Sequence, residues 1–535
     1  MLGFHIDLNT HNFTRRYLED WLKELASLGY DTIIWEIENA VALDAIPDCA
    51  APEAFSKDEF RELLQYSRTL GLDAIPLLQT LGHVEYILQH EPYQHLAEIP
   101  GSHSQFCPLN KKLPAFIGKL VSEYLDLFGE VSKFHIGLDE TWWLGKCPHC
   151  AEFVKKKSYS ELYIQYVNKI AAPLIQKKIT PIIWADMALT HPEALDKLSR
   201  DIMLFDWDYW SHQGMQGVHV WGLGGRPKPL SEYPAEIIAK INPFLFPDGD
   251  EPGRMPDAFW KAQFLAAQGF KVVTCPSSAS SGDSVFTPRN RLHLVNTFDS
   301  LNAGSAPNLE GSVLTSWTVR IHPWEYQRQI IGLPYFRRYF PEKSLNDYEL
   351  YFCRSRLGLN NVQFFKTIGK LSIPCFLSDS HKLGITKDIG KIPVNTVEKL
   401  VNGIPVKDVD EMLKENRARL AEYRSALDEL KAIRQQATRG KRLIDEWILA
   451  ARNLINRAEA AIFLLVCRKD KIKSALAEKD DRRAIGGKIL KDMAKLKSET
   501  DWFYVPILKP ARRKLAISWI YDSVEAVLKK RTGLK

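Results

Sequence analysis

Short apolar runs alternate with amphipathic stretches from the start of the chain to about residue 340, and this order constrains the fold most strongly. A strand–helix–strand order requires parallel pairing, because the helix carries the chain back to the starting edge. Eight segments have the pattern of strands: 3–8, 32–36, 74–78, 133–137, 181–184, 202–205, 271–274 and 312–315. Amphipathic runs over 17–28 and 58–70 end at Gly29 and Gly71, where helix C-caps favour glycine. Eight parallel strands predict an α/β fold, a closed (β/α)8 TIM barrel.

Beyond about residue 345 the periodicity becomes helical and charged residues become dense. Leu413, Leu420 and Leu427 lie seven apart, as on one stripe of a long helix, and the more apolar run over 443–466 contains Trp447. The predicted breaks between these helices are Gly440, the pair Gly486 and Gly487, Pro506 and Pro510. We therefore predict a barrel over residues 1–340 and an all-α C-terminal domain over residues 341–535.

Composition argues against several classes of partner. The 71 basic and 65 acidic residues nearly balance, at a net charge of +6, so no nucleic-acid partner is indicated. The longest apolar run, 460–467, is far shorter than the roughly 20 residues of a membrane span. Eight scattered cysteines and a first segment that reads as a strand, without a signal-peptide pattern, are typical of a cytoplasmic protein. We expect a cytoplasmic chain without a membrane span.

Polar and aromatic residues follow the predicted strands at their carboxyl ends. In a TIM barrel these ends line one common mouth, where binding and catalytic groups gather. The residues placed there are Glu36 after the second strand, His83 after the third, Asp139 and Glu140 after the fourth, Trp184 and Asp186 after the fifth, Tyr209 after the sixth and Trp317 after the last. We predict that this mouth is the functional site.

The two adjacent acids Asp139 and Glu140 are the most distinctive of these residues, and Trp142 and Trp143 follow at once. Ionised carboxylates repel each other and resist desolvation. An ionised Asp139 beside Glu140, with the two rings excluding water, would raise the pKa of Glu140 and keep it protonated. The alternative is an acidic turn on the surface.

Four ordered blocks over about residues 1–335 resemble the glycoside hydrolase family 20 β-N-acetylhexosaminidases, and most closely the small hexosaminidase D type. The blocks are His-Ile-Gly-Leu-Asp-Glu at 135–140, Pro-Leu-Leu-Gln-Thr-Leu-Gly-His-Val-Glu at 76–85, Trp-Ala-Asp-Met at 184–187 and Val-Leu-Thr-Ser-Trp at 313–317. The resemblance implies a TIM barrel that needs no cofactor. It also implies an exo-acting glycoside hydrolase that removes terminal β-linked N-acetylglucosamine or N-acetylgalactosamine from glycans with retention.

The adjacency of the acids bears on the mechanism. An ordinary retaining glycosidase places two carboxylates about 5 Å apart, one as acid and one as nucleophile. Neighbouring side chains in extended backbone point to opposite sides, so only Asp139 or Glu140 could approach the glycosidic oxygen. The resemblance implies that the 2-acetamido group of the substrate is the nucleophile. Glu140 is then the general acid and base, and Asp139 orients the acetamido N–H.

The resemblance also implies binding roles at the other strand ends. Tyr209 would donate its hydroxyl to the acetamido oxygen, and Trp184 and Trp317 would wall the sugar pocket. His83 would bind a sugar hydroxyl or the catalytic acids. Glu36 and Asp186 are candidate hydroxyl acceptors. Each of these residues could instead be packing or ion-pairing at the barrel end.

Two positions depart from the larger members of the family. The sequence Asp7-Leu8-Asn9 stands where they carry a sugar-binding arginine, and Val319, followed by Arg320, stands where they carry a glutamate. We therefore expect looser recognition that accepts both sugar epimers. The rival hypothesis is a non-catalytic barrel that binds amino sugars or glycans, with the helical domain as an interaction module. That domain could also form a homodimer interface.

Cys147-Pro148-His149-Cys150 has the C-x-x-C spacing of a zinc or redox pair. A structural zinc ion needs four ligands. Cys107, His103 or His149 could complete the set, but the chain has no second C-x-x-C. The sequence therefore assigns no metal to this protein.

Overall fold

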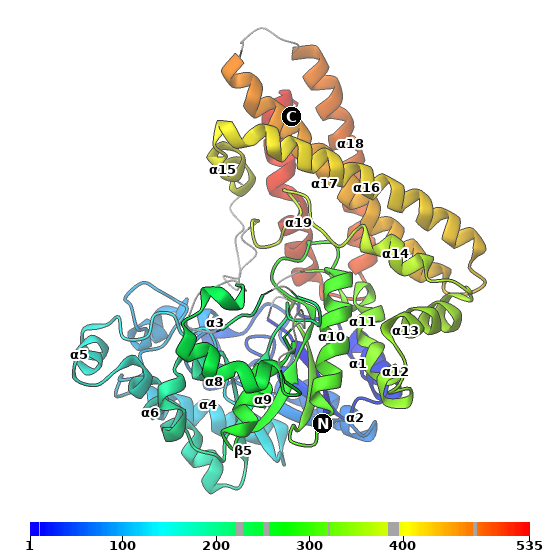
Figure 1. The fold of residues 1–535 in the computed structure, drawn as a ribbon. Coiled ribbons are helices and arrows are strands. Elements are labelled where there is room, and N and C mark those ends of the chain that lie inside the picture. Colours follow the sequence, from blue (N-terminus) through cyan, green and yellow to red (C-terminus); the bar gives the residue numbers. More distant parts are fainter. Residues whose placement is uncertain are drawn as a thin grey trace. The chain divides into compact units, whose positions relative to one another are not determined.

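The computed structural model describes residues 1–9, 11–215, 217–220, 228–249, 256–318, 321–383, 395–473 and 479–534 (Figure 1). Within these residues, eight parallel strands form a sheet that closes because β1 pairs with both β2 and β9. The barrel strands are β1 (Leu2–Asp7), β2 (Thr32–Glu36), β3 (Asp73–Leu77), β4 (Lys133–His135), β5 (Thr180–Trp184), β6 (Met203–Trp207), β7 (Lys271–Cys275) and β9 (Gly311–Ser316). The predicted TIM barrel is confirmed, and each predicted strand overlaps an observed one.

A further short strand, β8 (Ser277–Ala279), was not predicted. It follows β7 after Pro276, whose carbonyl accepts the Thr315 N–H at 2.8 Å. The Ser277 hydroxyl bonds to the Thr315 carbonyl at 3.1 Å. Serine has little strand propensity, so this run lacked the β-branched and aromatic pattern by which strands are recognised.

Helices follow the strands in the expected alternation. In the barrel half of the chain they are α1 (Arg15–Ser27), α2 (Lys57–Thr69), α3 (Glu85–Leu88), α4 (Leu113–Phe128), α5 (Pro148–Lys156), α6 (Tyr159–Gln176), α7 (Asp186–Thr190), α8 (Ala235–Leu245), α9 (Trp260–Ala267) and α10 (Asn290–Gly304). A capping box of Ser56 and Glu59 starts α2. Gly29 and Gly71 follow α1 and α2 with φ of +80° and +78°, as predicted for helix ends.

The described residues divide into two compact units. The first contains Met1–Asn9, Leu18–Ser277 and Val295–Ser316, and the second contains Thr10–Tyr17, Ser278–Leu294 and Trp317–Lys535. Short segments from the barrel half of the chain thus belong to the second unit. The division of the chain at residue 340 stays a prediction.

The second unit is built mainly of helices, as predicted. Its four long helices are α16 (Val409–Gln436), α17 (Lys441–Lys473), α18 (Lys479–Tyr504) and α19 (Pro510–Thr532). In Figure 1, α16 packs along α17 and α18 along α19. Its shorter helices are α11 (Arg328–Ile331), α12 (Leu333–Tyr339), α13 (Leu345–Phe352), α14 (Gln363–Gly369) and α15 (Thr396–Gly403). Within the described residues, no helix has the length and hydropathy that crossing a membrane requires.

Three of the four predicted helix breaks are confirmed, among them Pro510, which is the first residue of α19, and one is wrong. Gly440, with φ of +64°, separates α16 from α17, and Pro506 lies between α18 and α19. The pair Gly486 and Gly487 instead lies inside α18. A Cβ atom on Gly486 would lie 2.2 Å from Cγ2 of Thr532. Glycine is used here for a close approach between helices, which overrides its low helix propensity.

Trp447, near the start of α17, is wholly buried, and its ring packs against Tyr326 at 5.4 Å between centroids. We expect Trp447→Ala to lower the free energy of unfolding by about 3–5 kcal/mol, because it leaves a large cavity. Trp502→Ala is the matched control, since Trp502 is 77% exposed. Urea unfolding followed by circular dichroism measures both. Equal unfolding midpoints for the two variants would contradict the burial of Trp447.

Candidate active site

The backbone after β4 is not extended, contrary to the premise of the sequence argument. The strand ends at His135, and Gly137, Leu138 and Glu140 then have φ of +70°, +78° and +46°. Non-glycine residues in this left-handed region are strained and persist only where surrounding contacts hold them. The hydroxyl of Tyr163 on α6 donates to the Leu138 carbonyl at 3.1 Å, and the Glu140 N–H donates to Oδ2 of Asp186 at 3.0 Å.

This turn brings both acids of the pair to one imidazole. His83 Nε2 lies 3.1 Å from Oδ2 of Asp139 and 3.3 Å from Oε2 of Glu140. The two side chains therefore lie on the same side, and not on opposite sides as we expected. The Asp139 side chain is only 7% exposed, whereas that of Glu140 is 41% exposed. Of the two acids, Glu140 is the one that faces solvent.

Two glycines allow the loops after β3 and β4 to approach this closely. A Cβ atom on Gly82 would lie 2.5 Å from the Asp139 carbonyl oxygen. One on Gly137 would lie 2.0 Å from Oε1 of Gln79. His83, next to Gly82, is itself left-handed with φ of +55°. The strands beneath the loops pair at Leu77 and His135.

Asp186 lies behind the acid pair and is almost completely buried. Burial raises its pKa from 3.8 to about 8, and the charge of Asp139 adds to this rise. Hydrogen bonds from the Glu140 N–H and the Trp207 side chain act in the opposite direction. The carboxyl of Asp186 therefore holds the Glu140 backbone, and its predicted contact with a sugar hydroxyl stays a prediction.

Trp184 and Glu36 lie in the buried core of the barrel. Trp184 has no exposed surface, and its ring packs on His135 at 4.5 Å and on Phe205 at 5.9 Å between centroids. Burial lowers the pKa of His135 to about 3, so this histidine is neutral. Glu36 is also fully buried, with its oxygens 2.9 Å from Nε2 of His5 and 3.1 Å from Nε2 of Gln79. A sugar would reach Trp184 or Glu36 only if the covering groups moved.

An aromatic cluster follows β6. The Tyr209 ring stacks on Trp207 at 5.1 Å between centroids and packs against Trp210 at 5.6 Å. The Trp207 side chain lies close enough to Asp186 to lower the pKa of that carboxyl, so this cluster borders the acid site. Trp317 belongs to the second unit, where it is half-buried and donates its N–H to the Ala279 carbonyl at 3.2 Å. Val319 and Arg320 lie outside the described residues.

One expectation about the acid pair is wrong. Trp142 and Trp143 are 54% and 45% exposed, so their rings do not exclude water from Glu140. The Trp143 N–H instead donates to Oε1 of Gln105, at 3.0 Å, and so ties this loop to the loop after β3.

Sequence reasoning missed three residues that support the mouth. Tyr163 and Tyr166 of α6 hold the Leu138 and Thr80 carbonyls by their hydroxyls. Their spacing of three residues on an apolar helix face is the signal, but it does not distinguish this role from packing. Lys261 on α9 is buried, with Nζ 2.7 Å from Oδ2 of Asp208.

The mouth itself has no metal-ligand cluster among the described residues. Elsewhere in the described part of the chain, one group has metal-ligand spacing: Glu98, Cys107, Cys147 and Cys150. It includes neither Asp139 nor Glu140. His103 and His149, considered as ligands from the sequence, are not part of it.

The raised pKa of Asp186 predicts a change of stability with pH. Because folded Asp186 binds its proton more tightly than an unfolded aspartate, its contribution is complete below about pH 4 and is lost as the pH rises to about 8. Asp186→Asn keeps an acceptor for the Glu140 N–H and cannot ionise. Relative to the wild type, its free energy of unfolding should therefore increase from pH 4 to pH 8, as measured by urea unfolding. Asp196→Asn, at an exposed position, is the control, and a constant difference between Asp186→Asn and the wild type would contradict the prediction.

Several known proteins are similar to this chain. Residues 16–223 match the model of the glycosyl hydrolase family 20 catalytic domain. Hexosaminidase D of Homo sapiens is 26% identical over 321 residues, which cover 58% of this chain and 59% of the human protein. Hexosaminidase D of Bos taurus is 26% identical over 40% of this chain and 64% of its own length. The chain thus matches less than two thirds of either relative. The solved structure of Flavobacterium johnsoniae chitobiase aligns with 98% of this chain and 77% of its own, at 15% identity and a TM-score of 0.45. Over residues 16–223 the chain is thus similar to the glycosyl hydrolase family 20 catalytic domain, and it is also similar to these two hexosaminidases.

Proposed function

We propose that this protein is a retaining exo-β-N-acetylhexosaminidase, which hydrolyses terminal β-linked N-acetylglucosamine or N-acetylgalactosamine from glycans or glycoconjugates. The main observation in favour of this proposal is that Asp139 and Glu140 both contact the His83 imidazole at the mouth of the barrel. The family match and the relatives named Hexosaminidase D support the same activity.

The unequal exposure of the two acids supports different roles for them, proton transfer for Glu140 and binding of the acetamido group for Asp139. Glu140, with 41% of its side chain exposed, can reach the glycosidic oxygen of a bound substrate. It donates a proton to that oxygen as the bond to the anomeric carbon breaks, and it then takes a proton from the incoming water. Asp139, with 7% exposed, is held deeper. Its carboxylate accepts the acetamido N–H and stabilises the positive charge that develops on this group.

The position of His83 supports substrate assistance. A double-displacement glycosidase binds the sugar between its two carboxylates. Here Asp139 and Glu140 both approach the same nitrogen, Nε2 of His83, which does not favour a sugar held between two opposed carboxylates. The nucleophile then comes from the substrate. The acetamido carbonyl oxygen attacks the anomeric carbon to form an oxazolinium ion, and water opens this ion with a second inversion, which gives net retention.

The remaining binding roles rest on residues around the acids. We place the Tyr209 hydroxyl on the acetamido oxygen, because Tyr209 belongs to the aromatic cluster that borders Asp186. Trp317 belongs to the second unit, and its stacking on the sugar face stays an expectation from the resemblance. Trp184 shapes the pocket by fixing the neutral His135 ring beneath the acids. No cofactor takes part in this chemistry.

The catalytic role of Glu140 is tested by Glu140→Gln with an aryl β-N-acetylglucosaminide. Removing the general acid should lower kcat/KM about 10²- to 10⁴-fold. Glu152→Gln is the matched control, because Glu152 is an exposed glutamate on α5, the first helix after the same strand. No aglycone release by the wild type would favour a barrel that only binds glycans, and undiminished release by Glu140→Gln would remove the assignment.

Substrate assistance is tested by removing the acetamido group from the substrate. An aryl β-glucoside should be cleaved about 10⁴-fold less efficiently than the aryl β-N-acetylglucosaminide, since the site is built for the missing group. The aryl β-N-acetylgalactosaminide is the control for epimer tolerance and should be hydrolysed. Proton NMR of the first product should show the β-anomer. Efficient glucoside turnover, or an initial α-anomer, would exclude the mechanism.

A further inference from the structure

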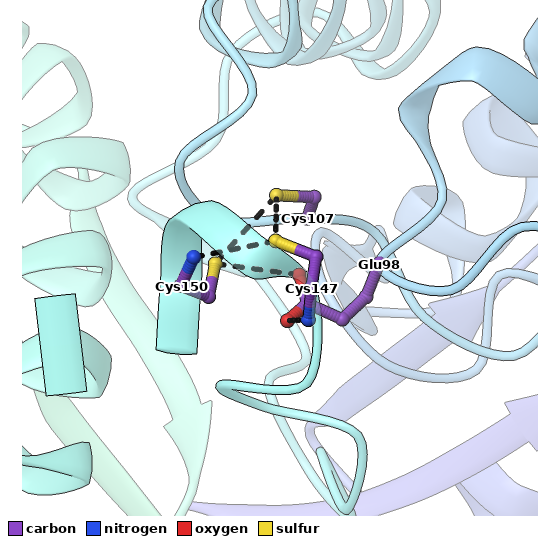
Figure 2. Close-up of side chains that lie close together, drawn as sticks. All are labelled: Glu98, Cys107, Cys147 and Cys150. Carbon is purple, nitrogen blue, oxygen red and sulfur yellow. Dashed lines mark hydrogen bonds between the residues drawn. The ribbon is translucent and has the colours of Figure 1, made fainter. Parts of the chain in front are cut away.

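Four potential metal ligands from two loops of the barrel converge at one point (Figure 2). Glu98 and Cys107 lie between β3 and α4, and Cys147 and Cys150 lie at the start of α5, after β4. Cys107 Sγ lies 3.6 Å from both Cys147 Sγ and Cys150 Sγ, and Cys150 Sγ lies 3.4 Å from Oε2 of Glu98. The four ligand atoms lie within 4.8 Å of one another.

These separations match the edges of a metal tetrahedron. Two thiolates bound tetrahedrally at about 2.3 Å from zinc lie roughly 3.8 Å apart, and a thiolate and a carboxylate oxygen lie roughly 3.6 Å apart. The observed 3.6 and 3.4 Å are close to both values. A disulfide would bring two sulfur atoms to about 2.05 Å. All eight cysteines lie within the described residues and are free thiols.

The Glu98 carboxyl is oriented as a ligand would be. Its Oε1 accepts the N–H groups of Lys146 and Cys147 at 2.8 and 2.9 Å. This leaves Oε2 directed at the sulfur cluster (Figure 2). Backbone bonds of this kind fix the direction of a metal ligand. Glu98 is 1% exposed, and no lysine or arginine of the described part of the chain forms an ion pair with it. A buried carboxylate without a cation is unfavourable, and a bound cation would remove this cost.

We propose that Glu98, Cys107, Cys147 and Cys150 bind one zinc ion. Soft thiolate ligands favour zinc over magnesium or calcium, and tetrahedral geometry is the usual arrangement for zinc. Four protein ligands leave no open position, so the ion is structural and does not activate water. This site does not depend on the proposed hydrolase activity, because metal content can be measured without turnover.

The zinc ion would join the two loops that carry the acid site. Gln105, two residues before Cys107, accepts the Trp143 N–H, and Trp143 lies three residues after Glu140. Gly82 and Gln105 also form a β-bridge. The ion therefore fixes the loop of His83 against the loop of Asp139 and Glu140. Because the ligands come from separate loops, zinc binding adds to folding stability.

The first test is the zinc content of the full chain, purified with reduced thiols and measured by mass spectrometry of the metal. We expect about one zinc ion per chain in the wild type and at least about 100-fold weaker zinc binding in Glu98→Gln and Cys150→Ser. Glu98→Gln keeps an oxygen for the two backbone N–H groups and replaces the ligand oxygen with an uncharged amide. Cys353→Ser is the matched control, because Cys353 is a buried free thiol outside the cluster, and it should retain zinc.

X-ray absorption at the zinc edge of the wild type identifies the ligands without a variant. We expect three sulfur atoms at about 2.3 Å and one oxygen at about 2.0–2.2 Å. This measurement decides the matter if Cys150→Ser does not fold. A wild type that binds no zinc when loaded with the metal, a disulfide among Cys107, Cys147 and Cys150 in freshly reduced protein, or a shell without sulfur would overturn the proposal. Zinc retained in both ligand variants would also overturn it.

Discussion

The His83 imidazole between Asp139 and Glu140 is the interaction on which the mouth of this barrel depends. Two neighbouring carboxylates repel each other, and here both lie within ion-pair distance of the same His83 nitrogen. Bringing both acids to one nitrogen requires left-handed backbone at Leu138 and Glu140. Two hydrogen bonds hold this strained backbone in place. The Tyr163 hydroxyl on α6 donates to the Leu138 carbonyl, and the Asp186 carboxyl accepts the Glu140 N–H. The barrel makes this possible because β3 and β4 are adjacent in the sheet.

The three acids of the site differ in burial, and burial affects their charge. Three carboxyl groups, those of Asp139, Glu140 and Asp186, lie together at one edge of the barrel. Burial raises the pKa of Asp186 to about 8, so this group is largely neutral at pH 7. Glu140, the most exposed of the three acids, is the one that we propose as the proton donor, and Asp186 accepts its backbone N–H.

The helical unit shows how packing can override local preference. Two adjacent glycines in a polar stretch ordinarily end a helix, yet α18 continues through Gly486 and Gly487. The missing side chain at Gly486 lets Thr532 of α19 and Phe463 of α17 approach closely. Gly440 also suggests a helix end from the sequence, and here the prediction holds. Its φ of +64° is part of the turn between α16 and α17.

Periodicity in the sequence determined the strand order, the barrel and the helical character of the later region, because burial of one face is a local property that side-chain spacing records. It also placed the acid pair and His83 at strand ends. Only the tertiary structure decided that Asp139 and Glu140 meet on one nitrogen, that Trp142 and Trp143 are exposed, and that Trp184 is enclosed. It also brought Glu98 and Cys107, some 40 or more residues upstream of Cys147 and Cys150, to the same point. These features arise where loops from different strands contact each other. Such contacts join residues that are far apart in the sequence, so the side-chain spacing within one segment does not predict them.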